Sequence, residues 1–388
     1  MIDPKKDGYI PRYIEGHVKE DLRKKMVFVA GPRQVGKTTL ARALCVGRGM
    51  EVTERYLNWD DPKDRENIML ERFPAEPGLL ILDEIHKFKR WRQVVKGLFD
   101  KRGGELQILV TGSARLDYYR KGGDSLQGRY YFYRLFPLSV DELEIPSSAA
   151  FSRLLTYGGF PEPFLLGSEV ETRRWSRLYR SRIVREDLRD LENVREIDMV
   201  EEMVLRLPDL VGSPLSLNSI REDLQVSHQS VSRWISILEN LYYLFRIYPF
   251  GAPKIRAVKK EAKHYHWDWT VVNDEGARFE NLVACHLMKW CCFFQDTEGR
   301  ELELRYFRDV DKREVDFVLM EDSKPIHFIE CKLNDMKPSG ALRYLKRHFP
   351  QVPATQVVRD SQEDLLTKEG VRVCAAHRFL TNMPFSPD

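Results

Sequence analysis

The stretch MVFVAGPRQVGKTTLARAL, residues 26–44, predicts a strand, a glycine-containing loop and a helix in direct succession. Met26–Ala30 is a short apolar run of the kind that forms a buried parallel strand. The loop behind it has the spacing G-x-x-x-x-G-K-T, from Gly31 to Thr38. Glycines let the backbone curl so that several N–H groups point at phosphate oxygens, and the following helix adds the positive end of its dipole. We therefore expect a nucleotide-phosphate site here and not an ordinary helix start.

The residues of this loop have separate expected roles at the nucleotide. Lys37 can reach the β- and γ-phosphates, and the hydroxyl of Thr38 can bind Mg²⁺. The other nucleotide contacts are expected in the loop and the first helical turn, at Gly31, Pro32, Arg33, Gln34, Val35, Gly36 and Thr39. The predicted cofactors are therefore ATP and Mg²⁺.

A second apolar strand, Leu79–Leu82 in GLLILDEIHKF, ends in two acidic residues. Asp83 at the strand tip would hold Mg²⁺ through water, and Glu84 is placed to orient and deprotonate an attacking water. Acids can end any strand, but these accompany a phosphate loop in the same chain. We therefore predict ATP hydrolysis and not binding alone, with Lys37 and Glu84 as catalytic residues.

A third strand, Leu106–Val110, stops at Thr111, Gly112 and Ser113. A hydroxyl there could sense the γ-phosphate, and it could equally cap the next turn. Further along, Arg129 in DSLQGRY could approach a phosphate across a lid or a subunit boundary, or it could be surface charge. Thr111 and Arg129 are candidate nucleotide contacts with both alternatives open.

Length and composition restrict the class of protein. The 388 residues suggest two or three domains, and 43% hydrophobic with 31% charged residues indicates a soluble globular chain. The net charge of +3 neither demands nor excludes nucleic acid, but residues 85–134 hold twelve Lys and Arg against four Asp and Glu. No run approaches the roughly 18 apolar residues of a membrane span, so no membrane partner is expected. Six cysteines without zinc spacing predict reduced thiols in a cytoplasmic protein.

Seven segments in this order resemble the prokaryotic AAA-type ATPases that carry a C-terminal domain of unknown function: YIPRYI, GPRQVGKTTL, ILDEIHK, VTGSA, SLQGR, LFPLSVDEL and YGGFPEP. The resemblance covers nearly the whole chain. It implies a P-loop domain of the ASCE type, with the catalytic glutamate on a strand added beside the P-loop strand. The second-region arginine finger of hexameric rings has no clear match. A homo-oligomer is therefore open, and a hexameric ring is not implied.

We predict four parts: a P-loop ATPase domain at 1–145, a helical lid at 146–205, a winged helix at 206–255 and a nuclease-like domain at 256–388. In the lid, the arginine-rich segment 173–194 has apolar residues at helical spacing. These are Trp175, Leu178, Ile183, Leu188 and Leu191. We expect the arginines to lie on a solvated or domain-facing surface.

Residues 214–250 predict a short helix to Leu224, a turn, and a second helix capped by Ser227. Strands are expected to follow, in the order of a winged helix. The second helix has an apolar face, Val231, Ile235 and Leu238, and a polar face, His228, Gln229, Ser232, Arg233 and Ser236. That polar face could enter a DNA major groove, with the lysine-rich residues 254–263 as a wing. A protein-binding or structural role is the alternative.

The C-terminal stretch FIECKL, residues 328–333, places Glu330 and Lys332 on one face of a strand. We predict an antiparallel hairpin that brings Asp316 across from them, while Glu280 leans over from a helix at 277–290. Two or three such carboxylates would hold Mg²⁺ through oxygen ligands. Lys332 would polarise the attacking water beside the metal.

These residues resemble the motif of the PD-(D/E)xK nucleases, in which Glu280, Asp316, Glu330 and Lys332 match the helix glutamate, the aspartate and the E-x-K. The resemblance implies a restriction-endonuclease-like fold, with Asp316, Glu330 and Lys332 as catalytic residues. A former nuclease would instead pair its acids with Lys332 and Arg313. We therefore expect an ATPase that regulates DNA engagement, with a metal-dependent nuclease domain. The alternative is a slow ATP-dependent switch whose C-terminal domain binds a protein or nucleic acid without cutting.

Overall fold

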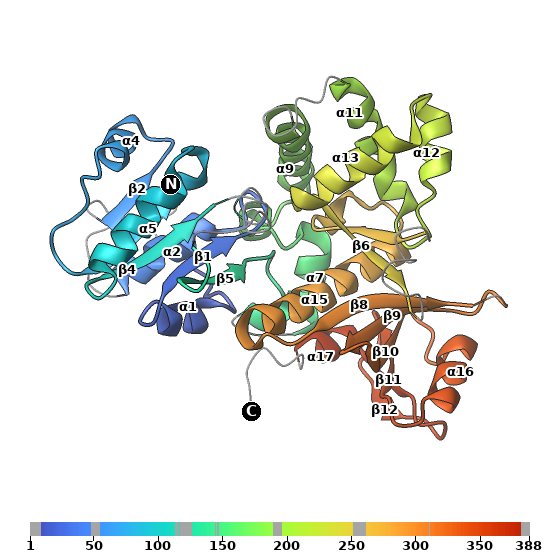
Figure 1. Cartoon of the computed structure of the whole chain (residues 1–388). Coiled ribbons are helices and arrows are strands. Elements are labelled where there is room, and N and C mark those ends of the chain that lie inside the picture. The colour runs from blue at the N-terminus through green and yellow to red at the C-terminus, as the bar shows by residue number, and fades with distance from the viewer. Residues whose placement is uncertain are drawn as a thin grey trace. The chain divides into compact units, whose positions relative to one another are not determined.

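The computed structural model describes residues 9–47, 55–112, 116, 126–143, 145, 147–188, 196–250, 261–309 and 311–381 (Figure 1). Several positions singled out in the sequence lie outside these ranges: Ser113, Leu191, Lys254, Arg256, Lys259 and Lys260. The chain forms two compact units, Met1–Pro137 (unit 1) and Leu138–Asp388 (unit 2). Residues 138–143, which we had placed in the first domain, pack with unit 2.

Unit 1 is built on a sheet of five parallel strands. Its order is β2 (Tyr56–Asn58), β3 (Gly78–Asp83), β4 (Leu106–Thr111), β1 (Met26–Ala30) and β5 (Tyr130–Arg134). The three apolar runs predicted as strands are confirmed as β1, β3 and β4. Continuous apolar runs suit these strands because β1 and most of β3 are buried on both faces.

Helices cover both faces of this sheet. Helix α5 (Trp91–Arg102) packs Trp91 and Val95 against the β1 side chains of one face, including Phe28. Helix α2 (Lys37–Val46) contacts β3 and β4 outside that cluster, on the other face. Among the described residues of this unit, the other elements are α1 (Glu15–Asp21), α4 (Pro62–Met69) and the 3₁₀ turn η1 (Ile85–Lys87).

The sheet order corrects one expectation taken from the family resemblance. The strand added beside β1 is β4, which ends at Thr111, and not the strand that carries the glutamate. Strand β3, with Asp83 at its end, lies one position further out. Thr111 therefore lies between the phosphate loop and the acidic pair.

Unit 2 begins with helices. After the turn η2 (Val140–Glu142) come α7 (Ser148–Tyr157), α8 (Pro161–Leu166), α9 (Glu169–Arg182), the π-helical turn η3 (Ile183–Asp187), α11 (Ile197–Arg206) and the turn η4 (Leu207–Leu210). Trp175, Ile183 and Leu188, which lie at helical spacing in the sequence, are buried. Leu178, which shares this helical spacing, is 62% exposed, because the buried face of α9 carries Trp175 and Tyr179, four residues apart.

The next helices are α12 (Leu217–Leu224) and α13 (His228–Asn240). Ser227 caps α13 by accepting a hydrogen bond from the Ser230 N–H, as predicted. The strands β6 (Leu244–Pro249) and β7 (Lys263–His266) follow as an antiparallel pair. This pair is not separate from the rest of the unit, because β6 also pairs with β8 (Leu302–Arg308).

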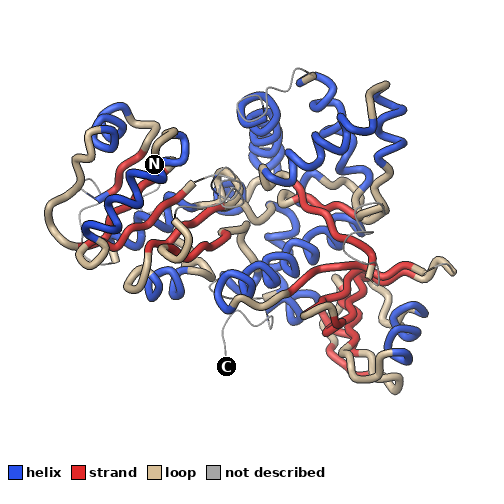
Figure 2. The backbone as a smooth tube through the Cα atoms, in the orientation of Figure 1, coloured by secondary structure: helices blue, strands red, loops and turns tan. Residues whose placement is uncertain are grey.

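The described strands of unit 2 form one sheet in the order β12-β13-β11-β10-β9-β8-β6-β7. Figure 2 draws the strands in red. The further strands are β9 (Glu314–Glu321), β10 (Lys324–Lys332), β11 (Ala354–Val358), β12 (Asp364–Leu366) and β13 (Arg372–Ala375). The predicted antiparallel pairing of β9 with β10 is confirmed. Strand β10 then pairs in parallel with β11.

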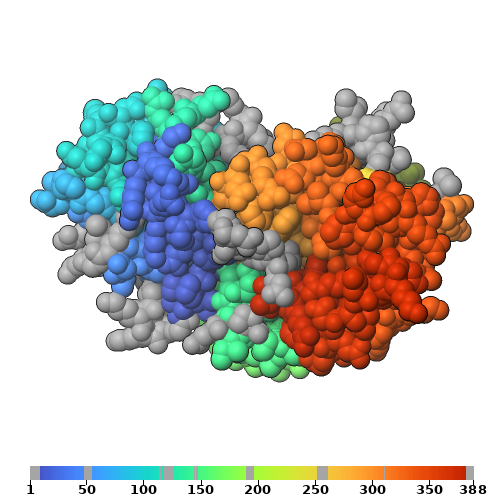
Figure 3. Space-filling view, turned by 90° about the horizontal axis from the view of Figure 1, so that it is seen from below, coloured from blue at the N-terminus to red at the C-terminus, as the bar shows by residue number. Residues whose placement is uncertain are grey.

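Helices from the C-terminal part of the chain pack on this sheet. Helix α15 (Glu275–Glu298) contacts β7, β8, β9 and β10, and α17 (Ala376–Thr381) contacts β11 and β13. Helix α16 (Gly340–His348) places Leu342 and Leu345 in a cluster with Val318 and Phe328. The space-filling view shows the C-terminal residues, drawn in red, as one continuous block (Figure 3).

Buried polar contacts join η2 to α15, around the short 3₁₀ turn η5 (Trp269–Val271). Lys289 donates to Ser139 Oγ at 2.6 Å and forms an ion pair with Glu142. His286 Nε2 accepts from the Val140 N–H at 3.2 Å, while Nδ1 lies 2.8 Å from the Leu282 carbonyl. Burial lowers the pKa of His286 to about 4, so the ring is neutral and can accept.

The six cysteines are all free, and five of them are buried, as expected of reduced thiols. Within the ranges that the structure describes, no helix has both the length and the apolar character needed to cross a membrane.

Candidate functional site

The carboxyl ends of the unit 1 strands line up in one row. Val29 of β1 is level with Thr111 of β4, Thr111 with Asp83 of β3, and Asp83 with Asn58 of β2. Because all five strands are parallel, the segments that follow them emerge at this one edge. The phosphate loop and the acidic pair, far apart in the sequence, are thereby brought to the same edge.

The phosphate loop requires its first glycine. Gly31 has φ +152°, and a Cβ built on it would lie 2.1 Å from the Leu135 carbonyl oxygen. The loop then passes through Gln34, with φ 60°, and Gly36, with φ 101°, before α2 begins at Lys37. Lys37 is buried, and its Nζ donates to the carbonyls of Gly31 at 2.9 Å and Pro32 at 2.6 Å.

Asp83 gathers three hydroxyl groups beneath the loop. Its Oδ2 accepts from Thr38 at 2.9 Å and from Tyr56 at 2.5 Å, and its Oδ1 accepts from Thr111 at 2.6 Å. Asp83 is 4% exposed, so these donors stabilise a carboxylate that water barely reaches. Mg²⁺ prefers oxygen ligands such as hydroxyl and carboxylate oxygens, so Thr38 and Asp83 fit that ion.

The contact to Asp83 gives Thr111 a role that neither sequence alternative named. Its hydroxyl holds the acid and does not cap the next turn. Tyr56 was not singled out in the sequence, where nothing around it points to a site. Burial, and then the charge of Asp83, raise the pKa of the Tyr56 hydroxyl, so it stays protonated and donates.

Glu84 continues beyond the strand end in a left-handed conformation, with φ 55°. Its N–H donates to the Thr111 carbonyl at 2.9 Å. Its carboxylate is half-buried and lies 3.3 Å from Lys87 Nζ, which also pairs with Asp60 at 2.6 Å. The backbone thus fixes Glu84 at the same edge as Asp83.

A buried arginine supports the loop from the N-terminal segment. Arg12 donates to the Val35 carbonyl at 2.7 Å and to the Phe136 carbonyl at 2.5 Å. Arg12 lies in the segment YIPRYI, residues 9–14, where no local pattern indicates that its side chain is buried.

Arg129 lies at the opposite edge of the same sheet. Its carbonyl accepts from the N–H of Met26, at the start of β1, whereas the phosphate loop follows the end of β1. Its side chain pairs with Asp100 at 2.8 Å. The structure therefore does not bring Arg129 to the phosphate loop of its own chain, and a contact across a subunit boundary stays a prediction.

The second group of predicted residues meets in unit 2, where β9, β10 and α15 adjoin. Lys332 Nζ lies 2.7 Å from Glu330 Oε1, so the two side chains are neighbours as period-two spacing requires. Asp316 faces them from β9, and its Oδ2 accepts from the Cys331 N–H at 2.8 Å. The predicted local geometry of this cluster is therefore found.

A lysine that the sequence analysis did not connect with this cluster lies among its acids. Lys263 of β7 is fully buried, and its Nζ lies 2.6 Å from Glu314, 3.4 Å from Glu280 and 3.9 Å from Asp316. Tyr265, two residues on, donates to Glu280 at 2.7 Å. In the segment KHYH, residues 263–266, successive side chains of a strand point to opposite faces, which places Lys263 and Tyr265 on the same face.

Arg313, which we had expected to neutralise the acids, pairs with Asp309 at 2.7 Å and with Asp311 instead. Its place is taken by Lys263, because the β6–β7 pair joins the sheet through β8. The alternative of a former nuclease paired the acids with Lys332 and Arg313. The pairing with Lys332 is confirmed, and the pairing with Arg313 is wrong.

The buried carboxyls of the cluster favour protonation. Burial, and then the charge of Asp316, raise the pKa of Glu330 to about 8 and that of Glu280 to about 7. Burial opposes the charge of Lys332, but Glu330 outweighs it and raises the Lys332 pKa.

A divalent ion does not fit the donor set as arranged. Glu330 Oε2 is a buried oxygen without a hydrogen-bond partner, so one oxygen of the cluster is free to bind a metal. Glu280 and Asp316, however, already share the ammonium of Lys263. Among the residues with described positions, no group of three His, Cys, Asp or Glu side chains could hold a metal.

Comparison with known proteins gives the class of the amino-terminal part. A family model described as an AAA domain matches residues 23–144. This part of the chain is therefore an AAA-type P-loop domain. Two models described as domains of unknown function (DUF8612 and DUF4143) match residues 148–274 and 275–379.

Relatives with curated sequences are themselves titled uncharacterised proteins. One from Mycobacterium tuberculosis is 24% identical over 245 residues, which cover 63% of this chain and 54% of the relative. One from Methanocaldococcus jannaschii is 22% identical and covers 87% of this chain and 80% of that protein. The chain thus spans about half the length of the mycobacterial relative.

Solved structures also show partial similarity. The RuvB Holliday junction branch migration motor of Thermotoga maritima is 18% identical, covers 60% of this chain and 89% of its own, and has a TM-score of 0.31. The Aeropyrum pernix ORC1 protein in complex with DNA is 14% identical, covers 71% and 94%, and has a TM-score of 0.37.

Gly31→Ala tests the packing of the phosphate loop. A Cβ at 2.1 Å from the Leu135 carbonyl oxygen forces the loop or the segment after β5 to move. We expect the free energy of unfolding of unit 1 to fall by about 1–3 kcal/mol, with loss of nucleotide binding. Calorimetry with and without ATP measures both quantities.

Gly97→Ala is the matched control for this variant. Gly97 lies within α5, and a Cβ there meets nothing within 4 Å. A helical alanine should stabilise unit 1 by up to ~1 kcal/mol. Equal stability of Gly31→Ala and wild type would contradict the packing described for the loop.

Lys263→Met tests the buried cation of unit 2. Without the ammonium, Glu280 loses its buried cation and Glu314 keeps only its contact to Arg308 at 3.7 Å, so we expect a loss of about 3–5 kcal/mol in the free energy of unfolding at pH 7. Lys263 lowers the pKa of Glu280, so its removal raises that pKa further above the unfolded value. Above about pH 7 the folded variant then binds more protons than the folded wild type, so the deficit shrinks as pH falls towards about 7 and stays constant below it.

Urea unfolding at several pH values measures this deficit. Lys324→Met, at the exposed start of β10, is the control and should change stability by less than about 0.5 kcal/mol. A Lys263→Met deficit that stayed constant above about pH 7 as well would show that the lysine does not act through these carboxyls.

Proposed function

We propose that the chain is an ATP-hydrolysing AAA-type switch whose unit 2 engages a nucleic-acid partner without cutting it. The observation that carries the ATPase is the convergence of Thr38, Thr111 and Tyr56 on Asp83 at the edge where the phosphate loop lies. An acid held in this way, next to a glutamate, is the arrangement that ATP hydrolysis requires.

The residues divide the work in the following way. The N–H groups of residues 31–38 bind the phosphates, and Lys37 exchanges its loop carbonyls for phosphate oxygens. Thr38 and Asp83 would hold Mg²⁺, which neutralises phosphate charge. Glu84 orients the attacking water and takes its proton, while Lys87 keeps the carboxylate in place.

For unit 2 we propose a winged-helix contact with DNA. Helix α13 buries Val231 and Ile235 and leaves His228, Gln229 and Arg233 exposed, which suits a helix that lies in a groove. The protein-binding alternative uses the same exposed face, so a DNA-binding assay with α13 variants distinguishes the two.

For the C-terminal domain, the alternative of a binding module now has the better support. A working nuclease of the PD-(D/E)xK type would need its acids for a metal. Here Lys263 already pairs with Glu280, Glu314 and Asp316, at distances from 2.6 to 3.9 Å. We therefore propose a nuclease-like domain that binds and does not cleave.

The ATPase proposal predicts two separable defects. Lys37→Ala should abolish ATP binding in titration calorimetry, because it removes the charge that meets the phosphates. Glu84→Gln should keep binding and lower the rate of phosphate release by about 10²–10⁴-fold. Both are measured with and without duplex DNA.

Glu105→Gln, an exposed carboxyl paired with Arg102, is the control and should leave turnover unchanged. Phosphate release by Glu84→Gln at the wild-type rate would remove Glu84 from the mechanism. Absence of ATP turnover by the wild type, in both conditions, would defeat the proposal.

The binding-module proposal predicts no cleavage. Wild-type protein with Mg²⁺ or Mn²⁺ should leave single-stranded and duplex DNA and RNA intact, with or without ATP, while it still retards DNA in a gel. Lys332→Ala should give the same result. Metal-dependent nicking by the wild type that Lys332→Ala abolishes would restore the nuclease.

A further inference from the structure

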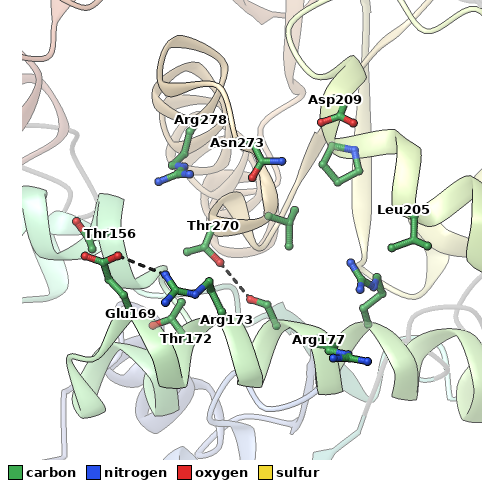
Figure 4. A pocket seen from close by; sticks show the side chains of 14 residues that line it. Thr156, Glu169, Thr172, Arg173, Arg177, Leu205, Asp209, Thr270, Asn273 and Arg278 are labelled. Atoms are coloured by element: carbon green, nitrogen blue, oxygen red, sulfur yellow. Dashed lines mark hydrogen bonds and ion pairs between the residues drawn. The ribbon is translucent and has the colours of Figure 1, made fainter.

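Two adjoining cavities lie along helix α9, within unit 2. Figure 4 shows the first of them. Their volumes are about 670 Å³ and about 370 Å³, and they share Arg177, Arg180 and Leu205 as lining residues. Together they form one groove, here called the α9 groove, along the length of the helix. No role in the ATPase site or in the α13 contact involves this groove.

The floor of the groove is a row of arginines. Arg173, Arg177 and Arg180 are spaced by four and three residues on α9, so they share one helix face. Arg185, in the turn after α9, continues the row into the second cavity. At 1.5 Å per residue the row extends over about 18 Å. Figure 4 shows Arg278 of α15 on the facing wall.

The four arginines of the row differ in whether a carboxylate pairs with them. Arg173 pairs with Glu169 at 3.5 Å, and Arg185 pairs with Glu201 at 2.5 Å. Within the described part of the chain, no ion pair joins Arg177 or Arg180 to a carboxylate. Both residues line both cavities, so they lie where the cavities adjoin; Asp209 and Glu201 line the groove as well.

The lining indicates which anion would bind. Guanidinium groups match the geometry of phosphate oxygens with paired hydrogen bonds. Of the described residues that line the two cavities, none is aromatic, so the groove offers no platform on which bases could stack. The groove therefore suits the backbone of a nucleic acid and not its bases. A mononucleotide would engage only part of a row this long.

We propose that the α9 groove binds the phosphodiester backbone of a nucleic acid, independently of sequence, through Arg177 and Arg180. This site is distinct from the α13 contact proposed above, because it uses a different helix. Failure of the α13 contact would leave it standing.

The test is the affinity of the full chain for a fluorescein-labelled dT 12-mer, measured by anisotropy without ATP over about 50–200 mM salt. Arg177→Ala/Arg180→Ala should weaken binding by about tenfold or more. It should also reduce the slope of log K against log salt by about 1.4, since each single-strand phosphate contact contributes about 0.7.

The control is Arg174→Ala/Arg182→Ala, which removes two charges from the same helix. Both residues are exposed, neither lines the groove, and Arg174 already pairs with Glu171 at 2.8 Å. This variant should weaken binding less than twofold. Equal losses in the two double variants would overturn the proposal, as would no loss in either.

Arg177→Lys/Arg180→Lys keeps the charge and removes the paired hydrogen bonds. It should retain the salt slope of the wild type while affinity falls by less than in the alanine variant. If the alanine variant fails to fold, as judged by circular dichroism, this variant carries the test: affinity equal to the wild type would overturn the proposal.

Discussion

The carboxylate of Asp83 is the contact on which the edge of the unit 1 sheet depends. It joins β3 to α2 through Thr38, to β4 through Thr111 and to β2 through Tyr56. A buried carboxylate without these donors would be costly, so the three hydroxyls and the acid require one another. The same contacts place Thr38 under the phosphate loop, so the interaction that stabilises the edge also builds the nucleotide site.

In unit 2, buried lysines pair with the carboxylates of the interior. Lys289 reaches Glu142, and Lys263 reaches Glu280, Glu314 and Asp316. In each case the lysine and its acids come from distant segments, so the ion pair holds different elements in one arrangement. Removing one partner of such a pair leaves an uncompensated charge, which is why buried pairs constrain the fold even where they add little net stability. The pairing around Lys263 also engages acids that a metal would need.

Sequence reasoning succeeded where local pattern determines structure. The strands β1, β3 and β4 followed from continuous apolar runs, because a parallel strand buried on both faces has no polar side. The neighbourhood of Glu330 and Lys332 followed from the two-residue period of a strand. Leu178 has helical spacing but is exposed, because spacing defines a face and not what covers it. Tyr56 gave no signal, since its partner lies on another strand.

The sequence by itself determined the phosphate loop, the acids that end β3 and the carboxylates of β9 and β10. Each depends on backbone geometry over a few consecutive residues. The tertiary structure alone decided that Lys263 neutralises those carboxylates, that Thr111 holds Asp83 and that the arginines of α9 line a groove. The reason is that the energy of a charge depends on its distance from other charges and on burial. Both are set by segments that meet only when the chain folds.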